Sequence, residues 1–358
     1  MKKFVYKITY ILGILISINV LTYFASKNSG WVESVYSQNI YLKIGSFLSN
    51  IFGILPFSFT EFLIIAALIS IIATLYVLIR NFSVTNFLNY LLNFLSILTT
   101  LVFLFWCLWG INNFRMPVES SLPFEKNKYT VDDLEKACEI LLEKAIYLRE
   151  HLDEDLNGIA TVNEGYMEIL RRSSASYDKI SEMYDIIPSA GKIRPKPMIL
   201  SKFMSGLNYT GMYNPYTGET NINIDEPIFN IPFTVCHEIA HLKGFPKENE
   251  ANFISFLVCT NSDDMFFQYS GYLSGLLYSA NALYRESPDA YFKLRSTYSE
   301  GINRDLTYST EYWDKHQGLA AKIGESNNNV FLKFTNQPEG TKSYGLVVDL
   351  IISYLLSN

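Results

Sequence analysis

The chain has 358 residues, of which 49% are apolar and only 18% are charged. This balance excludes a disordered chain and is not that of a freely soluble enzyme. The net charge of −6, without a cluster of basic residues, argues against nucleic acid as a partner. The four cysteines are too few for a disulfide-stabilised fold.

The apolar residues are concentrated in three uncharged stretches near the start of the chain. They cover residues 8–25, 62–79 and 91–110. At about 1.5 Å rise per residue, helices of this length cover roughly 27–30 Å, the thickness of the hydrocarbon core of a bilayer. The alternatives are a cleaved signal peptide for the first stretch and buried core helices for the others. Because no small-residue cleavage site follows Ala25 and three such stretches are hard to bury otherwise, we predict three transmembrane helices and the lipid bilayer as a partner.

Basic residues that flank these stretches predict their orientation. The N-terminal segment and the link between the second and third stretches hold Lys2, Lys3, Lys7 and Arg80. The first loop, residues 26–61, holds only two basic residues. Because basic residues favour the cytoplasmic side, we expect a cytoplasmic N-terminus. The predicted division is a membrane domain over residues 1–117 and an extracytoplasmic domain over residues 118–358.

The remainder of the chain has the composition of a globular domain. Thr130, followed three residues later by an aspartate, predicts the start of an amphipathic helix, and a second helix is expected over residues 166–183. A turn at residues 214–218 lies between two alternating runs and predicts a β-hairpin. After Pro232 the sequence is mostly helical, and residues 345–356, which are too short for a fourth span, are predicted to form a core helix. We therefore predict an α-helical membrane anchor followed by a mainly helical α+β domain with a small hairpin or sheet.

The most informative segment is a His-Glu-x-x-His sequence formed by His237, Glu238 and His241, which uses two of only four histidines. On a helix, positions i and i+4 share a face, so both imidazoles can bind one metal ion. Pro232 suits the first turn of such a helix, and Gly244 suits its end. Zinc prefers two imidazoles, a carboxylate and one open position, and the intervening glutamate can act as general base. A chance histidine pair on an exposed helix face is the alternative.

A third ligand is expected from the carboxylates that follow. Glu248 and Glu250 differ by about 200° around a helix, so only one of them can face the metal. Glu248 shares its face with small and polar residues, which favours it; Glu250 is the alternative third ligand. Asn252 is expected to supply a hydrogen bond that orients a ligand histidine. Cys236 and Cys259 are interpreted as ordinary buried thiols.

The His-Glu-x-x-His sequence and the segment at residues 248–252 together resemble the gluzincin metallopeptidases. The likeness is to a membrane-bound type whose second motif reads Glu-x-x-Ala-Asp, in which the first Glu binds zinc. It matches Glu248 to that ligand and Asn252 to the Asp, and it implies a zincin-like fold, Zn²⁺ as cofactor and a peptide substrate. The departures are Asn for Asp and a very short gap after His241. By this resemblance, residues 220–224 would form an edge strand that pairs with the substrate.

Four further motifs extend over most of the chain. They are Trp-Gly-Ile-Asn at 109–112 leading to Arg115, Tyr-Asn-Pro-Tyr-Thr-Gly-Glu at 213–219, Pro-Phe-Thr before Cys-His-Glu at 232–238, and Glu-Ala-Asn-Phe at 250–253. Together with the three apolar stretches, they resemble a bacterial family catalogued as a domain of unknown function (DUF 3810). The resemblance implies a bacterial cytoplasmic membrane but no substrate.

These observations predict a membrane-anchored zinc metallopeptidase that hydrolyses peptides or proteins. One alternative is a non-catalytic zinc-binding membrane protein, either a sensor or an assembly factor. Another is a structural membrane protein whose His-Glu-x-x-His sequence binds no metal. Nothing in the sequence distinguishes the four side chains that could stabilise an oxyanion: Tyr269, Tyr272, His316 and Tyr344.

Overall fold

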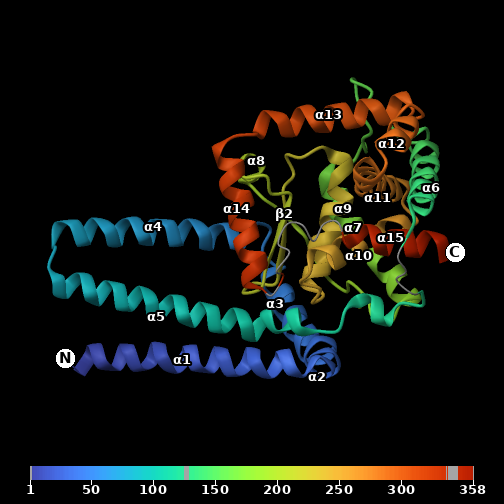
Figure 1. The fold of residues 1–358 in the computed structure, drawn as a ribbon. Coiled ribbons are helices and arrows are strands. Elements are labelled where there is room, and N and C mark those ends of the chain that lie inside the picture. Colours follow the sequence, from blue (N-terminus) through green and yellow to red (C-terminus); the bar gives the residue numbers. More distant parts are fainter. Residues whose placement is uncertain (1, 125–128, 336, 338–345, 358) are drawn as a thin grey trace. The chain divides into compact units, whose positions relative to one another are not determined.

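The computed structural model describes residues 2–124, 129–335, 337 and 346–357. It divides into two compact units. The first comprises Met1–Met116 together with Asn214–Glu219, and the second comprises Pro117–Tyr213 together with Thr220–Asn358. The described part is mainly helical, with one small mixed sheet (Figure 1).

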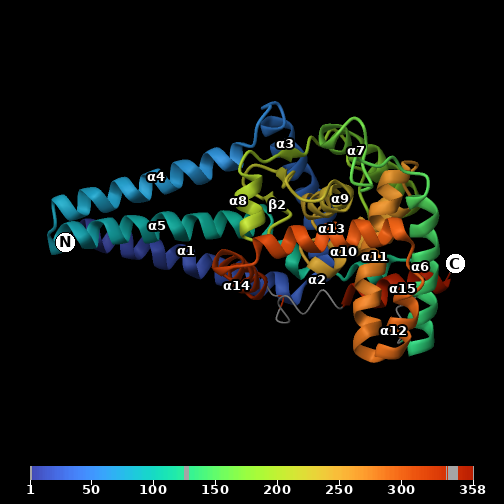
Figure 2. The ribbon, with the colours of Figure 1, turned by 90° about the horizontal axis from the view of Figure 1, so that it is seen from above.

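Three helices of the first unit are long and apolar enough to cross a membrane: α1 (Lys2–Lys27), α4 (Phe59–Arg80) and α5 (Val84–Leu108). They confirm the three predicted apolar helices. The helices α4 and α5 begin before the uncharged stretches do, because the hydroxyls of Ser58 and Ser83 accept hydrogen bonds from backbone amides of their first turns. The helices α1 and α5 lie side by side (Figures 1 and 2). Their orientation in a membrane stays a prediction.

Short helical elements connect these long helices. They are α2 (Ser29–Trp31), the π-helix η1 (Val32–Tyr41), α3 (Leu42–Phe52) and the 3-10 helix η2 (Gly110–Phe114). Glu33 of η1 forms a largely buried ion pair with Arg115, with 2.6 Å between oxygen and nitrogen. This pair connects the first loop to the residue that follows η2.

The second unit is built around a buried helical core. Its helical elements are η3 (Val118–Ser121), α6 (Val131–Arg149), α7 (Tyr166–Met183), α8 (Ser201–Gly206), η4 (Ile228–Asn230), α9 (Ile231–Leu242), α10 (Glu248–Thr260), α11 (Met265–Glu286), α12 (Pro288–Arg295), α13 (Glu300–His316), α14 (Leu319–Phe334) and α15 (Leu346–Ser357). The capping box at Thr130, the bounds of α7 and the buried C-terminal helix α15 confirm the predictions. The helix α10 is buried from Asn249 to Thr260 and packs against α7, α9, α11 and α15.

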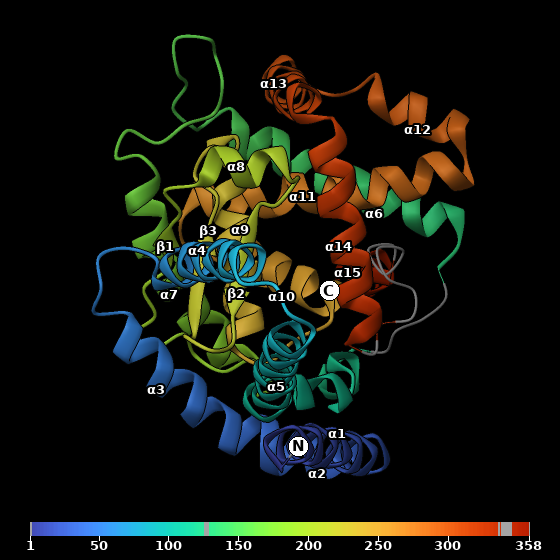
Figure 3. The same ribbon diagram turned by 90° about the vertical axis from the view of Figure 1, so that its left-hand side faces the viewer.

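A three-stranded sheet lies beside α9 (Figure 3). Its order is β1 (Lys196–Pro197), β3 (Glu219–Ile222), β2 (Gly211–Asn214), with β1 parallel to β3. The predicted hairpin is confirmed, but the expectation of an edge strand at residues 220–224 is wrong. The strand β3 is central and β2 is an edge, because β1 pairs with the other side of β3. A two-residue strand that contains Pro197 leaves no alternating pattern in the sequence, so β1 was not predicted.

Candidate metal centre

The helices α9 and α10 bring the two predicted ligand segments together. Pro232 occupies the first turn of α9, and Gly244, at a φ of +85°, ends it in a conformation that favours glycine. The small side of α10 packs on α9: the hydroxyl of Ser255 donates to the carbonyl of Phe233 over 2.6 Å, and the thiol of Cys259 lies 3.6 Å from the carbonyl of Pro232. This close packing of α9 and α10 positions the predicted ligands, which lie one to two helical turns from these contacts.

His237, His241 and Glu248 meet at this interface. Each offers a ligand atom, and these atoms all lie within 4.8 Å of one another. The carboxylate of Glu248 is 3.4 Å from Nε2 of His237 and 3.6 Å from Nε2 of His241. Tetrahedral ligands at about 2.0–2.2 Å from zinc are separated by about 3.3–3.6 Å, so the spacing fits such an ion. Among the residues that the structure describes, this is the group found able to hold a metal.

Hydrogen bonds orient both imidazoles toward this point. Nδ1 of His237 lies 2.8 Å from Oδ1 of Asn252, and Nδ1 of His241 lies 2.8 Å from the carbonyl oxygen of Phe245. Each oxygen accepts the Nδ1 proton, which leaves the lone pair of each Nε2 directed at the carboxylate of Glu248. The donor set and its outer hydrogen bonds therefore fit a zinc ion.

Charge around the group also favours a cation. Burial lowers the pKa of His241 to about 4, so this imidazole is neutral at neutral pH. Burial opposes the charge of His237, but the hydrogen bond and charge of Glu248 outweigh it and raise the pKa of His237. A bound metal ion would supply the positive charge that the Glu248 carboxylate otherwise obtains from a proton on His237.

Glu238 lies next to the ligands with a buried carboxylate. Its Oε2 atom has no hydrogen-bond partner among the described residues, and the backbone amide of Tyr213 in β2 donates to the carboxylate. Burial raises the pKa of Glu238 to about 8. Gly211 packs so closely that an added Cβ would lie 2.5 Å from Oε1 of Glu238. The edge strand β2 thus contacts the predicted general base directly.

Two groups near the site were not found from the sequence. Glu226 is buried between β3 and α9, accepts a hydrogen bond from the hydroxyl of Thr234 and lies close enough to Glu238 for their charges to interact. Burial raises the pKa of Glu226 to about 8. The ring of Tyr278 lies tilted against the ring of Phe233, with 6.2 Å between the ring centroids, and burial, with a smaller effect from the charge of Glu248, raises the pKa of Tyr278. The contacts of Glu226 and Tyr278 with the site arise from packing between distant segments, which the sequence pattern does not report.

Other predicted candidates lie elsewhere. Oε1 of Glu250 accepts from the amide of Val118 and from Nζ of Lys247, so its charge is already paired away from the histidines. The hydroxyl of Tyr269 donates to Asp305, and Nδ1 of His316 lies against the carbonyl of Tyr312. Tyr272 packs edge-on against Phe256. Tyr344 lies outside the described residues.

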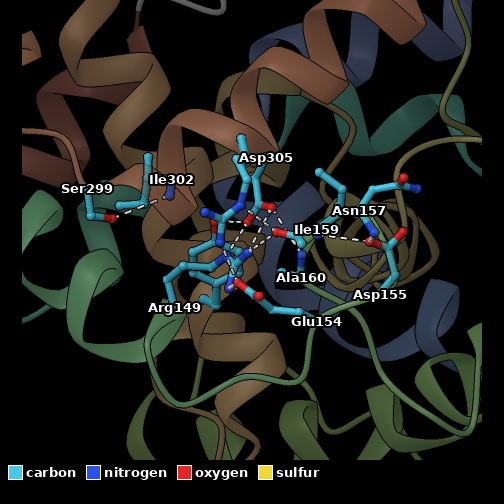
Figure 4. Close-up of polar contacts among 12 residues, drawn as sticks. Arg149, Glu154, Asp155, Asn157, Ile159, Ala160, Ser299, Ile302 and Asp305 are labelled. Carbon is cyan, nitrogen blue, oxygen red and sulfur yellow. Dashed lines mark hydrogen bonds and ion pairs between the residues drawn. The ribbon is translucent and has the colours of Figure 1, made fainter.

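The acidic loop after α6 has the residue spacing of a calcium-binding loop: Asp153, Asp155, Asn157, Gly158 and, after five further residues, Glu164. The structure does not gather its carboxylates into a metal group. Oδ1 of Asp155 instead accepts from the amides of Asn157 and of Ile159 (Figure 4), and Oδ2 of Asp153 accepts from Asn163. The loop is closed by its own hydrogen bonds.

Comparisons with known proteins complete the description. A family described as a protein of unknown function (DUF3810) matches residues 36–352. No curated protein and no solved structure matches the chain. The comparisons bear out the resemblance to the DUF3810 family and give no support to a resemblance to the zincin metallopeptidases.

Proposed function

The chain belongs to the DUF3810 family, whose description assigns no function, and we propose from its site that it is a membrane-anchored, zinc-dependent metallopeptidase. One observation carries the proposal. His237, His241 and Glu248 converge, while Glu238 beside them keeps a buried carboxylate oxygen without a hydrogen-bond partner among the described residues. Three protein ligands leave one coordination position for water, which distinguishes a catalytic from a structural zinc site.

Each of these residues would have its own role in the proposed peptide hydrolysis. Zinc held by the two histidines and Glu248 would lower the pKa of a bound water from about 15.7 toward 7. Glu238 would take the proton from that water and deliver it to the leaving amine. The amide of Tyr213 holds one side of this carboxylate, and Gly211 leaves the space that it occupies. Asn252 keeps His237 in the tautomer that binds metal.

The proposed setting is a bacterial cytoplasmic membrane. The helices α1, α4 and α5 would anchor the chain, with a cytoplasmic N-terminus and the second unit outside the cytoplasm. Peptides or proteins would be the substrates, and nucleic acid would not be a partner. The support is the length of the three helices and the position of the basic residues. Reporter fusions after residue 120 should be active only on the extracytoplasmic side, and cytoplasmic activity would contradict the orientation.

The activity is tested with a matched pair of proteins. Full-length wild type and Glu238→Gln are purified in detergent, loaded with zinc and incubated with a mixed peptide library, and the products are identified by mass spectrometry. Wild type should cleave, and Glu238→Gln should bind equal zinc but cleave at least about 10²-fold more slowly. Equal zinc with no cleavage by either protein would contradict the peptidase and favour a non-catalytic zinc-binding sensor or assembly factor.

A further inference from the structure

The turn of the β-hairpin, Asn214–Glu219, carries a distinctive sequence that the proposed chemistry does not use. These six residues read Asn-Pro-Tyr-Thr-Gly-Glu and pack as part of the first unit, whereas the strands on either side continue into the second. A hairpin turn is usually solvated and tolerant of change. Here Thr217 and Glu219 are buried, so this turn has a different role.

Glu219 is bonded to the first turn of the long apolar helix α4. Its Oε1 accepts from the amide of Phe59 over 3.0 Å, and its Oε2 accepts from the amide and the hydroxyl of Thr60 over 2.9 and 2.7 Å. Asn214 donates to the same hydroxyl over 3.1 Å. A carboxylate at a helix N-terminus satisfies amides that the helix cannot bond itself and interacts favourably with its dipole. The turn and α4 thus complete one another's hydrogen bonding.

Two further contacts fix the turn to α3 and α5. The hydroxyl of Tyr216 donates to the carbonyl of Leu101 in α5 over 2.9 Å. Gly218 has a φ of +67°, and an added Cβ would lie 2.7 Å from the backbone nitrogen of Ser49 in α3. Only glycine suits both this conformation and this approach. The turn therefore contacts three helices of the first unit through both polar groups and shape.

The same hairpin contacts the proposed general base at the other end of β2. Gly211 and Tyr213 meet the carboxylate of Glu238 and precede Asn214, the first residue of the turn, by three residues and one residue. Because β2 has a neighbouring strand on one side only within the part of the chain that the structure describes, its position depends on its two ends as well as on β3.

We propose that the turn 214–219, held by its own hydrogen bonds to Thr60, restrains the edge strand β2, so that Glu219 and Thr60 are positioning residues for Glu238. The expected effect on cleavage rests on the proposed function of Glu238 as general base. The restraint of β2 by the turn does not depend on that function and can be measured without it.

The test uses the full-length protein in detergent. Thr60→Val and Glu219→Gln remove parts of the anchor, and Thr74→Val, on an exposed part of the same helix α4, is the matched control. Hydrogen–deuterium exchange is followed in peptides that cover residues 209–223, with zinc content and peptide cleavage measured on the same samples. Exchange in α9 and α10 reports whether each variant is folded.

The expected result is about 10- to 100-fold faster exchange in the hairpin of both anchor variants, the range for a lost hydrogen bond to a charged group. Zinc content and exchange in α9 and α10 should match wild type, cleavage should fall, and Thr74→Val should change nothing. Unchanged hairpin exchange in both anchor variants would overturn the proposal. If wild type itself cleaves nothing, the proposed function fails while the exchange data still decide whether the turn restrains β2.

Discussion

The Nδ1 atom of His237 lies 2.8 Å from the Oδ1 atom of Asn252, whose Nδ2 atom is buried without a partner among the described residues. Asn252→Ala should weaken zinc binding about 10- to 100-fold, because the imidazole loses the group that fixes its tautomer. Asn252→Asp keeps an acceptor and removes the unpaired amide, so its zinc affinity should stay within about tenfold of wild type. Competition with a chromogenic chelator measures both. Equal affinity of the alanine variant and wild type would contradict this role of Asn252.

Gly211 permits the close contact between β2 and Glu238. A Cβ at this position would lie 2.5 Å from Oε1 of Glu238, so Gly211→Ala must displace the carboxylate. Cleavage should fall at least about tenfold while zinc stays bound, since a small misplacement of a catalytic group is costly. Gly206→Ala is the control, because an added Cβ there meets no atom within 4 Å. Similar cleavage rates for the two alanine variants would show that the contact is unimportant.

Glu226 should make stability depend on pH. Burial raises its pKa in the folded chain to about 8, compared with about 4.3 when unfolded. Between these values the folded state holds a proton that the unfolded state has lost, so this residue lowers stability as pH rises from about 4 to 8. Glu226→Gln should therefore raise the melting temperature relative to wild type more at pH 8 than at pH 5, with a difference in unfolding free energy on the order of a few kcal/mol. The exposed Glu164→Gln serves as control, and a difference that does not grow with pH would contradict the assignment.

Asp305 holds a buried cluster in the second unit (Figure 4). It accepts from Nε of Arg149 over 2.6 Å, from the hydroxyl of Tyr269 over 2.6 Å and from the amide of Ala160 over 3.0 Å. Asp305→Ala leaves the Arg149 charge buried without its main partner, so the free energy of unfolding should fall by about 3–5 kcal/mol.

The matched control for this cluster is Lys293→Gln, which removes the exposed partner of Glu135. Exposed ion pairs contribute little to stability, so this variant should unfold like wild type. Denaturant titration of the full chain in detergent measures both changes. A loss of less than about 1 kcal/mol in Asp305→Ala would show that the cluster is not needed for stability.

Local patterns were enough to predict much of this molecule. Long uncharged stretches, the capping box at Thr130 and the turn of the hairpin act over a few residues, and each was found where the sequence indicated it. The i, i+4 spacing of His237 and His241 and the small face of α10 are likewise properties of single helices. The structure brings these histidines and Glu248 together, as the helical geometry suggested.

What the sequence did not predict depends on packing between distant segments. The approach of Gly211 and Glu226 to Glu238 arises from the sheet and the loop before α9, and neither residue belongs to a local pattern. The wrong edge strand has the same origin, because the two-residue β1 decides which side of β3 is free. The helix α10 was expected to have one bulky and one polar side, but it is buried all round at the centre of its unit.

Substitutions of Glu248 and Glu250 distinguish the loss of the metal from a general loss of stability of α10. The oxygen of Glu250 is engaged by Lys247 and the amide of Val118, so Glu250→Gln should lower stability by about 1–3 kcal/mol without loss of zinc. Glu248→Gln should keep the fold but lose the metal, because two imidazoles alone hold zinc poorly.

The zinc content of purified wild type, Glu248→Gln and Glu250→Gln, measured by inductively coupled plasma mass spectrometry after removal of loosely bound metal, tests the metal centre most directly. We predict about one zinc ion per chain in wild type and Glu250→Gln and far less in Glu248→Gln. Wild type without zinc would contradict the metal centre itself. Zinc kept by Glu248→Gln but lost from Glu250→Gln would contradict the assignment of the third ligand.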